Sequence, residues 1–347
     1  MQKKNVPSYA AKSASGQLSP LLIHRRDVGE NDVSIDIKYC GICHTDIHFA
    51  KNDLGVTSYP FVPGHEIIGV VTAVGKKVKK FKEGELVGVG CMVDSCKECN
   101  FCMENTEQFC EKGMTMTYNS PDLISGGMTY GGYSKKIVVN QHFVLKVSKD
   151  LEPQRVAPLL CAGITSYSPL NKFNIKKGDK VGIIGLGGLG HLGIKFANAM
   201  GADVIMITSS KEKCEDAINL GAKDVILSSD EKQIKKNINN FDLLLNTIPS
   251  DHNVTKYLQI LKSQKIMVVV GLANISIHTR SLLFGRNQIV GSLIGGLKET
   301  QEMLNFAAKN NIVADIELID AKEINATFKR IEKNKVKYRA VIDIESI

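Results

Sequence analysis

The sequence predicts an α/β protein in which a β-rich N-terminal part precedes a doubly wound domain with a parallel sheet. Three observations support this prediction. Short strand-like segments separated by turns, with few helical repeats, run through residues 1–150. From residue 180 onward, continuous apolar runs alternate with helical stretches, which is typical of parallel strands buried on both faces. A glycine-rich turn follows the first of these runs.

The expected strands are short runs rich in β-branched and apolar residues, bounded by turn residues. In the N-terminal part they cover 32–40, 67–75, 85–91, 131–139 and 143–147. In the second part they cover 180–184, 202–208, 223–229, 241–249, 265–273 and 288–296, and a helix is expected at 253–262. The chain of 347 residues is long enough for two domains with substantial cores.

Composition excludes several classes of protein. The chain is 43% hydrophobic and 23% charged, without an apolar stretch of the length that a membrane span requires, so no membrane partner is expected. Its first residues lack the apolar region of a secretory signal, and a cytoplasmic location is therefore expected. The formal charge of +8 comes from dispersed lysines, and the chain has no tryptophan, which argues against a nucleic-acid partner.

Five of the nine cysteines lie within residues 91–110, and four of them have the spacing C-x2-C-x2-C-x7-C. Such steps bend a chain around one tetrahedral ion, and four thiolates leave no open position for water. We therefore expect a closed structural zinc site made by Cys96, Cys99, Cys102 and Cys110. An iron–sulfur cluster and ordinary buried cysteines remain alternatives. Cys91, outside the repeat, is expected to be a core residue at a strand end.

A second group of metal-ligand residue types lies upstream. Cys43 follows Gly41, and His65 and Glu66 follow a Pro-Gly turn just before an apolar strand. All three are residue types that bind zinc. Spacing alone does not show that they converge, and a packing role for each of them stays open.

The segment 180–200 carries a nucleotide-binding signal. The apolar run leads into Gly185, Gly187 and Gly190, spaced G-x-G-x-x-G, and a helical pattern follows. Strand, glycine turn and helix thus occur in the order that a dinucleotide site requires, with the helix N-terminus facing the phosphates. The alternative is a glycine-rich turn that binds no nucleotide.

The end of the next strand bears on the choice of cofactor. An NAD-preferring domain places an acidic residue there to bind the ribose hydroxyls, but Asp203 is at the opposite end of this strand. Hydroxyl and ammonium groups, which suit a 2′-phosphate, stand at the tip instead, so the sequence favours NADP. These residues are Thr208, Ser209, Ser210 and Lys213. A serine N-cap at a solvated helix start is the alternative.

Taken with these residues, the chain resembles the zinc-dependent medium-chain alcohol dehydrogenases, and among them the cinnamyl alcohol dehydrogenase group. The similarity extends along nearly the whole chain through long motifs. They are "GICHTDIH", "PGHEIIG", the four-cysteine segment, "APLLCAGITSYSPL", "GLGGLGHLGIKFA", "GSLIGGLKETQEML" and "KYRAVIDI".

The resemblance implies a GroES-like catalytic domain interrupted by a Rossmann domain. The catalytic domain would comprise residues 1–161 and 297–347, with the structural zinc lobe at 91–112, and the NADP-binding domain residues 162–296. It also implies two zinc ions per chain and a homodimer, with a homotetramer as the alternative.

The same resemblance implies roles for individual residues. Cys43, His65 and Cys161 would hold the catalytic zinc, with Glu66 adjacent. Thr45 and His48 would relay the proton, and Asp46 would orient a zinc ligand, although a turn-forming role for Asp46 stays open. His44 would lie near the cofactor phosphates. The other implied cofactor-binding residues are Thr165, Gly188, Leu189, Thr247, Gly271, Ser292 and Ile294.

The implied activity is the interconversion of aldehydes and primary alcohols, cinnamyl-type or medium aliphatic, by hydride transfer with NADP(H). A polyol or other secondary-alcohol dehydrogenase is the alternative, weakened because sorbitol-type relatives usually carry an acidic residue where this chain has Cys161. Zinc-free quinone reductase relatives lack the ligand set. A non-catalytic nucleotide-binding role would need no Thr45–His48 relay. The sequence does not identify the physiological substrate.

Overall fold

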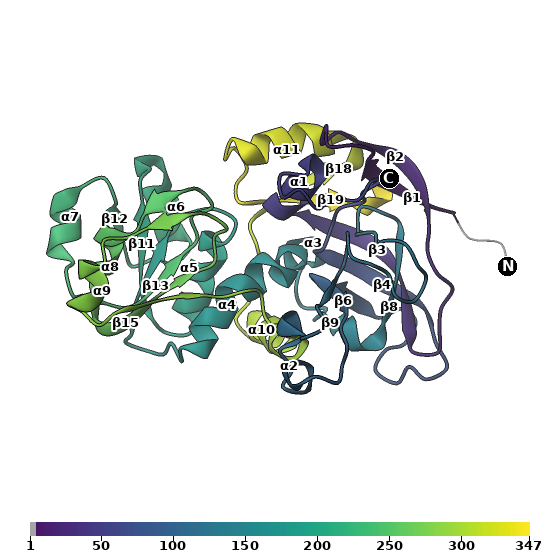
Figure 1. The fold of residues 1–347 in the computed structure, drawn as a ribbon, viewed down its shortest axis with the longest axis horizontal. Coiled ribbons are helices and arrows are strands. Elements are labelled where there is room, and N and C mark those ends of the chain that lie inside the picture. The colour runs from purple at the N-terminus through teal and green to yellow at the C-terminus, as the bar shows by residue number, and fades with distance from the viewer. Residues whose placement is uncertain (1–4) are drawn as a thin grey trace. The chain divides into compact units, whose positions relative to one another are not determined.

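The computed structural model describes residues 5–347, which divide into two compact units (Figure 1). The first unit extends to Cys161 and resumes at Gly295–Ile347, and the second is Ala162–Ile294. Both contain helices and sheets, so the predicted α/β class is confirmed. Among residues 5–347, no helix is both long and apolar enough to cross a bilayer.

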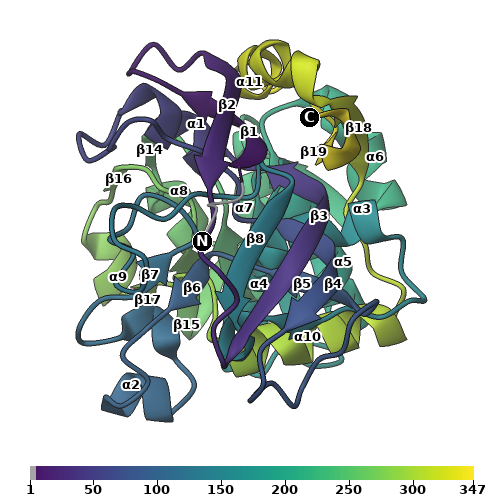
Figure 2. The ribbon, with the colours of Figure 1, turned by 90° about the vertical axis from the view of Figure 1, so that its right-hand side faces the viewer.

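The first unit is built on a seven-stranded sheet with the order β18-β19-β3-β4-β5-β9, in which β8 also pairs with β3. These strands are β3 (Asp32–Ile42), β4 (Ile67–Val74), β5 (Leu86–Val89), β8 (Lys136–Asn140), β9 (Leu145–Lys146), β18 (Ile316–Asp320) and β19 (Arg339–Asp343). Two smaller sheets are formed by β1 (Asn5–Ala11) with β2 (Leu18–His24) and by β6 (Met92–Asp94) with β7 (Thr115–Met116). Figure 2 shows β3, β4, β5 and β8 side by side.

The helices of the first unit are α1 (His44–Lys51), α2 (Asn100–Met103), α3 (Pro153–Val156), α10 (Leu297–Lys309) and α11 (Ile324–Glu332). α10 and α11 lie at opposite ends of this unit in both views. Strand β3 is the centre of the sheet because it pairs with β4, β8 and β19. Its β-branched residues Val33, Ile35 and Ile37 are buried, and because they occupy alternate positions they share one face of the sheet.

The second unit contains a six-stranded sheet with the order β12-β11-β10-β13-β15-β17, and every pairing in it is parallel. Its strands are β10 (Lys180–Ile184), β11 (Asp203–Thr208), β12 (Asp224–Leu227), β13 (Phe241–Asn246), β15 (Leu261–Val269) and β17 (Gln288–Gly291). A small parallel pair is formed by β14 (His252–Asn253) and β16 (Ile275–Ser276). The predicted parallel sheet is confirmed.

Helices flank this parallel sheet (Figure 1). They are α4 (Ala162–Lys172), α5 (Gly190–Ala199), α6 (Cys214–Asn219), α7 (Glu231–Lys236), α8 (Thr255–Leu258) and α9 (Arg280–Leu283). The buried faces of β11, β13 and β15 form a hydrophobic core that includes the fully buried Phe241, Leu244 and Met267.

The helix expected at 253–262 is wrong in its extent. Helix α8 covers only Thr255–Leu258, and β15 begins at Leu261, which pairs with Phe241 of the neighbouring strand. The sequence pattern of this segment favours a helix, but Leu261 is buried and pairs with the neighbouring strand of the sheet. Tertiary context therefore overrides helix propensity here. The expected strand 265–273 therefore begins four residues earlier and ends at Val269.

A carboxylate ties together the amino-terminal ends of three strands of the second unit. Asp242 accepts hydrogen bonds from the Lys180 N–H at 3.0 Å and the Lys262 ammonium at 2.7 Å, and pairs with Lys265 at 3.2 Å. Burial would raise the pKa of Asp242, but these donors outweigh it and lower the pKa below its usual value.

We predict that Asp242→Asn lowers the free energy of unfolding at pH 7 by about 1.5–3 kcal/mol, the range for hydrogen bonds to charged groups. Because the folded pKa is depressed, this stabilisation is present above the unfolded pKa of about 3.9 and is lost as the pH falls through the folded value. Urea unfolding of the unmodified protein and of Asp242→Asn at pH 7 and near pH 3 measures the difference in free energy of unfolding. A difference that stays constant across these pH values would contradict the prediction.

Candidate functional site

Four thiols gather in the lobe that follows β6. The sulfur atoms of Cys96, Cys99, Cys102 and Cys110 all lie within 4.8 Å of one another. The chain wraps so that the Cys99 N–H donates to the Cys96 sulfur and the Cys96 N–H donates to the Cys110 sulfur, each at 3.4 Å. The N–H groups of Glu98 and Cys99 lower the pKa of Cys96 to about 6, which favours the thiolate. This donor set fits a tetrahedral zinc ion with no open position.

A second cluster brings together Cys43, His65, Glu66 and Cys161, whose ligand atoms also lie within 4.8 Å of one another. Cys43 follows the end of β3 and precedes α1. His65 and Glu66 precede β4, which pairs with β3, and the Gly41 N–H donates to the Glu66 carbonyl at 2.9 Å. Pairing of these two strands therefore makes the ligand types adjacent.

Cys161 arrives from far along the sequence, at the end of the short 3₁₀ segment Ala157–Leu160. Its sulfur lies within 4.8 Å of the Cys43 sulfur, and the closeness of Cys161 and His65 lowers the pKa of Cys43 well below its usual value although burial opposes the change. A depressed thiol pKa is what a metal ligand requires, because the thiolate is the ligand form.

Behind the cluster, Asp46 is completely buried and its carboxylate is saturated by four contacts. It accepts from the Cys43 N–H at 2.8 Å, the Gly64 N–H at 3.0 Å and the Tyr133 hydroxyl at 3.2 Å, and it lies 3.2 Å from Nδ1 of His65. Since Nδ1 faces Asp46, Nε2 is the ring nitrogen left for a metal. Asp46 thus fixes both Cys43 and His65.

Glu66 differs from Asp46 because one of its oxygens is unpaired. Its Oε1 accepts from the guanidinium of Arg339 in β19, whereas the buried Oε2 has no hydrogen-bond partner. Burial raises the pKa of Glu66 to about 7, against the opposing charge of Arg339. A side chain at position 41 would collide with this carboxylate, so Gly41 makes room for it. An orphaned buried oxygen beside two thiols and an imidazole fits a metal cation.

Helix α1 carries the two expected relay residues. The Cys43 thiol lies 3.5 Å from the Thr45 hydroxyl. Thr45 and His48 are one helical turn apart, so they share a face of α1. Nδ1 of His48 lies 2.8 Å from the carboxylate of Asp53, and both side chains are partly exposed. His44 is at the first position of α1, where burial lowers its pKa.

In the second unit the glycine segment forms a tight turn between β10 and α5. Gly185 has a φ of +95°, and a side chain at Gly190 would collide with the Gly185 carbonyl. Thr247, at the end of β13, braces the turn by donating to the carbonyls of Ile184 and Gly185 at 2.9 Å. A side chain at Gly187 would meet no protein atom within 4 Å, so this glycine leaves its space open to a ligand.

The tip of β11 lies beside this turn. Thr208 ends the strand and accepts from the Ser210 N–H at 3.2 Å. The Lys213 ammonium donates to the carbonyl of Leu186, inside the glycine segment, at 2.8 Å, and burial lowers its pKa. The structure therefore brings Lys213 to the glycine turn, although it belongs to a 3₁₀ turn (Lys211–Lys213) rather than to α6.

The other expected cofactor residues also lie in the second unit, except His44. Thr165 is buried in α4, and Gly271 packs against the Ile248 backbone. The Ser292 N–H donates to the Val269 carbonyl at 3.2 Å, and Ile294 adopts a φ of +38°. Gly188 and Leu189 occupy the turn that enters α5.

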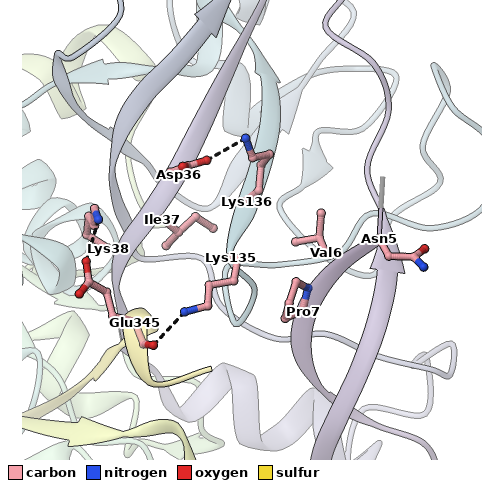
Figure 3. Close-up of a pocket in the computed structure, with 9 residues that line it drawn as sticks. All are labelled: Asn5, Val6, Pro7, Asp36, Ile37, Lys38, Lys135, Lys136 and Glu345. Carbon is pink, nitrogen blue, oxygen red and sulfur yellow. Dashed lines mark hydrogen bonds and ion pairs between the residues drawn. The ribbon is translucent and has the colours of Figure 1, made fainter. Parts of the chain in front are cut away.

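A separate cavity of about 540 Å³ lies in the first unit between β1, β3, β8 and the C-terminal segment (Figure 3). Its ammonium groups are already paired: Lys38 with Glu345 at 2.7 Å, Lys136 with Asp36 at 2.8 Å, and Lys135 with the Glu345 carbonyl at 2.9 Å. Neither cysteine cluster lines it. It is not a candidate for the metal chemistry.

Sequence reasoning missed the roles of four residues: Arg339, Tyr133 and Cys91, which lie beside the second cluster, and Asp53, which contacts His48. Asp53 is five residues after His48, where helix α1 ends in a left-handed Asn52 that turns the chain back. Arg339 comes from β19 and Tyr133 from the segment before β8, and no local pattern indicates them. The expectation that Cys91 is a strand core residue is wrong: it lies half-buried between β5 and β6, and its thiol donates to the Leu160 carbonyl at 3.8 Å.

Comparisons with known proteins agree on one family. Residues 29–149 match the alcohol dehydrogenase GroES-like domain, and residues 188–309 match the zinc-binding dehydrogenase domain. The aldehyde reductase YahK of Escherichia coli is 48% identical over 99% of this chain and 98% of its own length. A cinnamyl alcohol dehydrogenase of Sorghum bicolor is 41% identical with a TM-score of 0.95, covering 99% of this chain and 98% of that one. The CAD of Helicobacter pylori, solved with NADP(H), is 40% identical with a TM-score of 0.92 and covers 99% of each chain.

We predict that protein purified without added metal contains about two zinc ions per chain and negligible iron, given the two ligand clusters. Cys99→Ser should lose about one zinc and lower the melting temperature by about 5 °C or more, because a closed site contributes directly to stability. Elemental analysis and thermal unfolding measure both effects.

Cys214→Ser is the matched control, since Cys214 lies outside both clusters and should leave the zinc content unchanged. Iron with sulfide absorbance, or a fully stable Cys99→Ser variant that is inactive, would contradict the assignment of the lobe as a structural zinc site.

Proposed function

Since the chain belongs to the zinc-dependent medium-chain alcohol dehydrogenases, in the cinnamyl alcohol dehydrogenase group, we propose that it interconverts aldehydes and primary alcohols with NADP(H). The observation that supports this most is the convergence of Cys43, His65, Glu66 and Cys161 with Asp46 behind them. Three strong ligands and an adjacent carboxylate keep a coordination position open, which separates a catalytic from a structural zinc site.

In this proposal the residues have distinct roles. Cys43, His65 and Cys161 hold the zinc, Glu66 lies beside it, and Asp46 keeps His65 in the tautomer that presents Nε2. When bound, zinc supplies Lewis-acid polarisation of the substrate carbonyl, and the nicotinamide supplies the hydride. Cys96, Cys99, Cys102 and Cys110 hold the second, structural ion.

The protein's own groups must move the proton. Thr45 receives it near Cys43, and His48 carries it to the surface, where the imidazole is partly exposed. Asp53, whose carboxylate lies 2.8 Å from Nδ1, positions the His48 ring. This contact adds a positioning residue to the pair expected from the sequence.

The cofactor proposal is NADP(H), bound by the glycine turn and the tip of β11. Thr208, Ser209 and Ser210 offer hydroxyl and backbone donors and Lys213 a charge, without an acidic side chain at the strand end. The solved Helicobacter pylori relative is complexed with NADP(H), which supports the same choice. The remaining proposed contacts are His44, Thr165, Gly185, Gly187, Gly188, Leu189, Gly190, Thr247, Gly271, Ser292 and Ile294.

We further propose a cytoplasmic homodimer, with a homotetramer as the other outcome of a mass measurement. All nine cysteines are free of disulfides, which supports a reducing compartment. Strand β17 is an edge of the six-stranded sheet, and an edge strand offers unpaired backbone groups to a second copy. The large apolar side chains of Leu283 and Phe284 are 75% and 81% exposed nearby in the sequence, which is typical of an interface.

The function is tested by measuring kcat/KM with NADPH and NADH on a panel of cinnamaldehyde-like and medium aliphatic aldehydes, with a polyol as the competing substrate. We predict aldehyde reduction with a preference of at least about tenfold for NADPH, since one charge-assisted hydrogen bond to the 2′-phosphate is worth roughly 1.5–3 kcal/mol. Ser209→Asp with Lys213→Ala should shrink or reverse the preference, because it adds repulsion and removes attraction.

Lys211→Ala is a matched control, because Lys211 belongs to the same 3₁₀ turn as Lys213. We expect it to keep the larger part of the preference. Equal kcat/KM values with the two cofactors would refute the NADP proposal, and a higher value on the polyol than on every aldehyde would refute the substrate class.

The relay generates a separate prediction. Thr45→Ala should lower kcat by about 10²-fold or more, since positioned proton transfer typically contributes 10²–10⁴-fold. Thr45→Ser keeps the hydroxyl and should retain most of the activity. His48→Ala should have a smaller effect than Thr45→Ala, because water reaches the exposed end of the relay, and it should flatten the pH profile near neutrality. Unchanged turnover in Thr45→Ala would remove this residue from the mechanism.

A further inference from the structure

A buried acidic residue in the four-cysteine lobe is not used by either metal cluster. Glu107 begins the 3₁₀ turn Glu107–Phe109, between Cys102 and Cys110, and is only 1% exposed. A buried carboxylate is costly unless it is hydrogen-bonded, so its partners indicate what it does. Burial would raise the pKa of Glu107, but His142 and the Leu297 N–H outweigh it and lower the pKa.

Glu107 connects the lobe to the start of α10. Its Oε2 accepts from the backbone N–H of Leu297, the first residue of that helix, at 3.0 Å. The first N–H groups of a helix lack partners within the helix, and a negative charge at this end is favourable. The N-cap residue, Gly296, has no side chain to serve them. Glu107 therefore caps α10 from outside.

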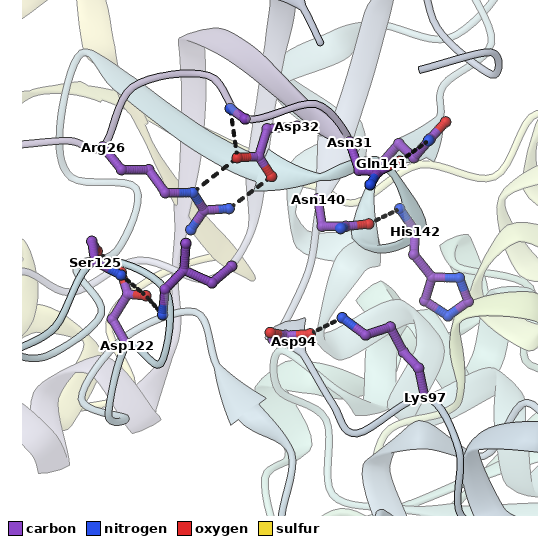
Figure 4. Close-up of polar contacts among 12 residues, drawn as sticks. Arg26, Asn31, Asp32, Asp94, Lys97, Asp122, Ser125, Asn140, Gln141 and His142 are labelled. Carbon is purple, nitrogen blue, oxygen red and sulfur yellow. Dashed lines mark hydrogen bonds and ion pairs between the residues drawn. The ribbon is translucent and has the colours of Figure 1, made fainter. Parts of the chain in front are cut away.

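The backbone of the lobe also packs directly on this helix start. A side chain at Gly296 would collide with the Asn105 carbonyl and would lie 2.9 Å from the Glu107 carboxylate. Oε1 of Glu107 lies 3.2 Å from Nε2 of His142. The Asn140 side chain holds His142 by accepting from its backbone N–H at 3.0 Å (Figure 4). In the same view, Lys97 pairs with Asp94 at 2.6 Å where the lobe begins.

The chain just before α10 is strained. Ile294 has a φ of +38°, in the left-handed region that a β-branched residue rarely adopts. Such a conformation persists only where the surrounding structure fixes the backbone. The chain re-enters the first unit at Gly295, and Ser292 and Ile294 are proposed cofactor contacts. Only two residues separate Ile294 from the N–H that Glu107 holds.

We propose that Glu107 is a positioning residue through which the four-cysteine lobe fixes the segment Ser292–Leu297 for cofactor binding. The inference rests on the proposed NADP-dependent function. Because Glu107 lies between Cys102 and Cys110 in the chain, a metal bound by the four thiols would also fix the position of the Glu107 carboxylate. The lobe would then hold the segment Ser292–Leu297 in place in addition to stabilising the fold.

Helix α10 has a second attachment that does not involve the lobe. Gln301 accepts from the Lys146 N–H at 2.8 Å and donates to the Lys146 carbonyl at 3.1 Å. Loss of this attachment should affect the middle of α10 and leave Leu297 held by Glu107. Gln301→Ala is therefore a control for loosening of the helix in general.

The test combines hydrogen exchange of the peptide that covers 292–300 with NADPH titration by fluorescence and kcat measurement on the zinc-loaded protein. In Glu107→Ala we expect faster exchange in that peptide. The Kd for NADPH should rise about fivefold or more, because part of the free energy of one charge-assisted hydrogen bond is lost from cofactor binding. The kcat should stay within about twofold of that of the unmodified protein. Glu107→Gln, which keeps the shape and one acceptor, should show the same changes at smaller size.

Glu98→Gln is the matched control in the lobe, since the exposed side chain of Glu98 pairs with the exposed Lys112 and the substitution keeps the backbone N–H, and it should change neither exchange nor Kd. Loss of the lobe metal, as expected in Cys99→Ser, should also speed exchange at 292–300 relative to Cys214→Ser. Unchanged exchange and Kd in Glu107→Ala would overturn the inference, and so would unchanged exchange after loss of the lobe metal. If Glu107→Ala does not fold, the Gln variant and the metal-loss experiment decide by the same criteria.

The outcome is separable from the proposed function. Absence of aldehyde reduction by the unmodified protein would refute the function, whereas exchange at 292–300 is measured without any substrate and decides the positioning role of Glu107 on its own.

Discussion

The antiparallel pairing of β3 with β4 places Cys43 and His65 at neighbouring strand ends, and the buried carboxylate of Asp46 then fixes how both residues face. The other parts of the centre are added to this frame. The 3₁₀ segment before Cys161 brings this thiol to the cluster, β19 brings Arg339 to Glu66, and α1, which follows Cys43, carries Thr45 and His48. One strand pair therefore gathers the residues of the proposed metal site and the proposed proton relay.

The sequence predicts those parts of the fold and site that are local. Parallel strands appear as continuous apolar runs, the four-cysteine spacing closes around one point, and the glycine turn lies between its strand and helix. Convergence of Cys161 with Cys43 and the ion pair of Arg339 with Glu66 join residues far apart, so no periodicity reveals them, and only the family resemblance indicated Cys161. The helix expected at 253–262 failed because Leu261 pairs with Phe241 in the sheet.

The two metal clusters differ in their donors and in how they are supported. In the lobe, the sulfur atoms of Cys96 and Cys110 accept hydrogen bonds from N–H groups of their own loop, so the cluster is supported from within the lobe. At the second cluster, thiols, imidazole and carboxylate come from separate elements that the sheet brings together. A metal site with four protein ligands stabilises the fold and has no position for a substrate. Ligands that come from several elements can leave one coordination position open for a substrate.

The buried carboxylates show which acidic residues support the fold and which are available to a ligand. Asp46 receives four contacts and Glu107 receives two that use both of its oxygens, so neither has an oxygen without a partner. Glu66 gives one oxygen to Arg339 and keeps the other buried and unpaired. Leaving a buried acceptor unsatisfied costs roughly 1–3 kcal/mol, and Glu66 carries this cost beside the cluster of Cys43, His65 and Cys161. Asp46 and Glu107, whose oxygens all have hydrogen-bond partners, therefore position other groups, whereas Glu66 has an oxygen available to a metal.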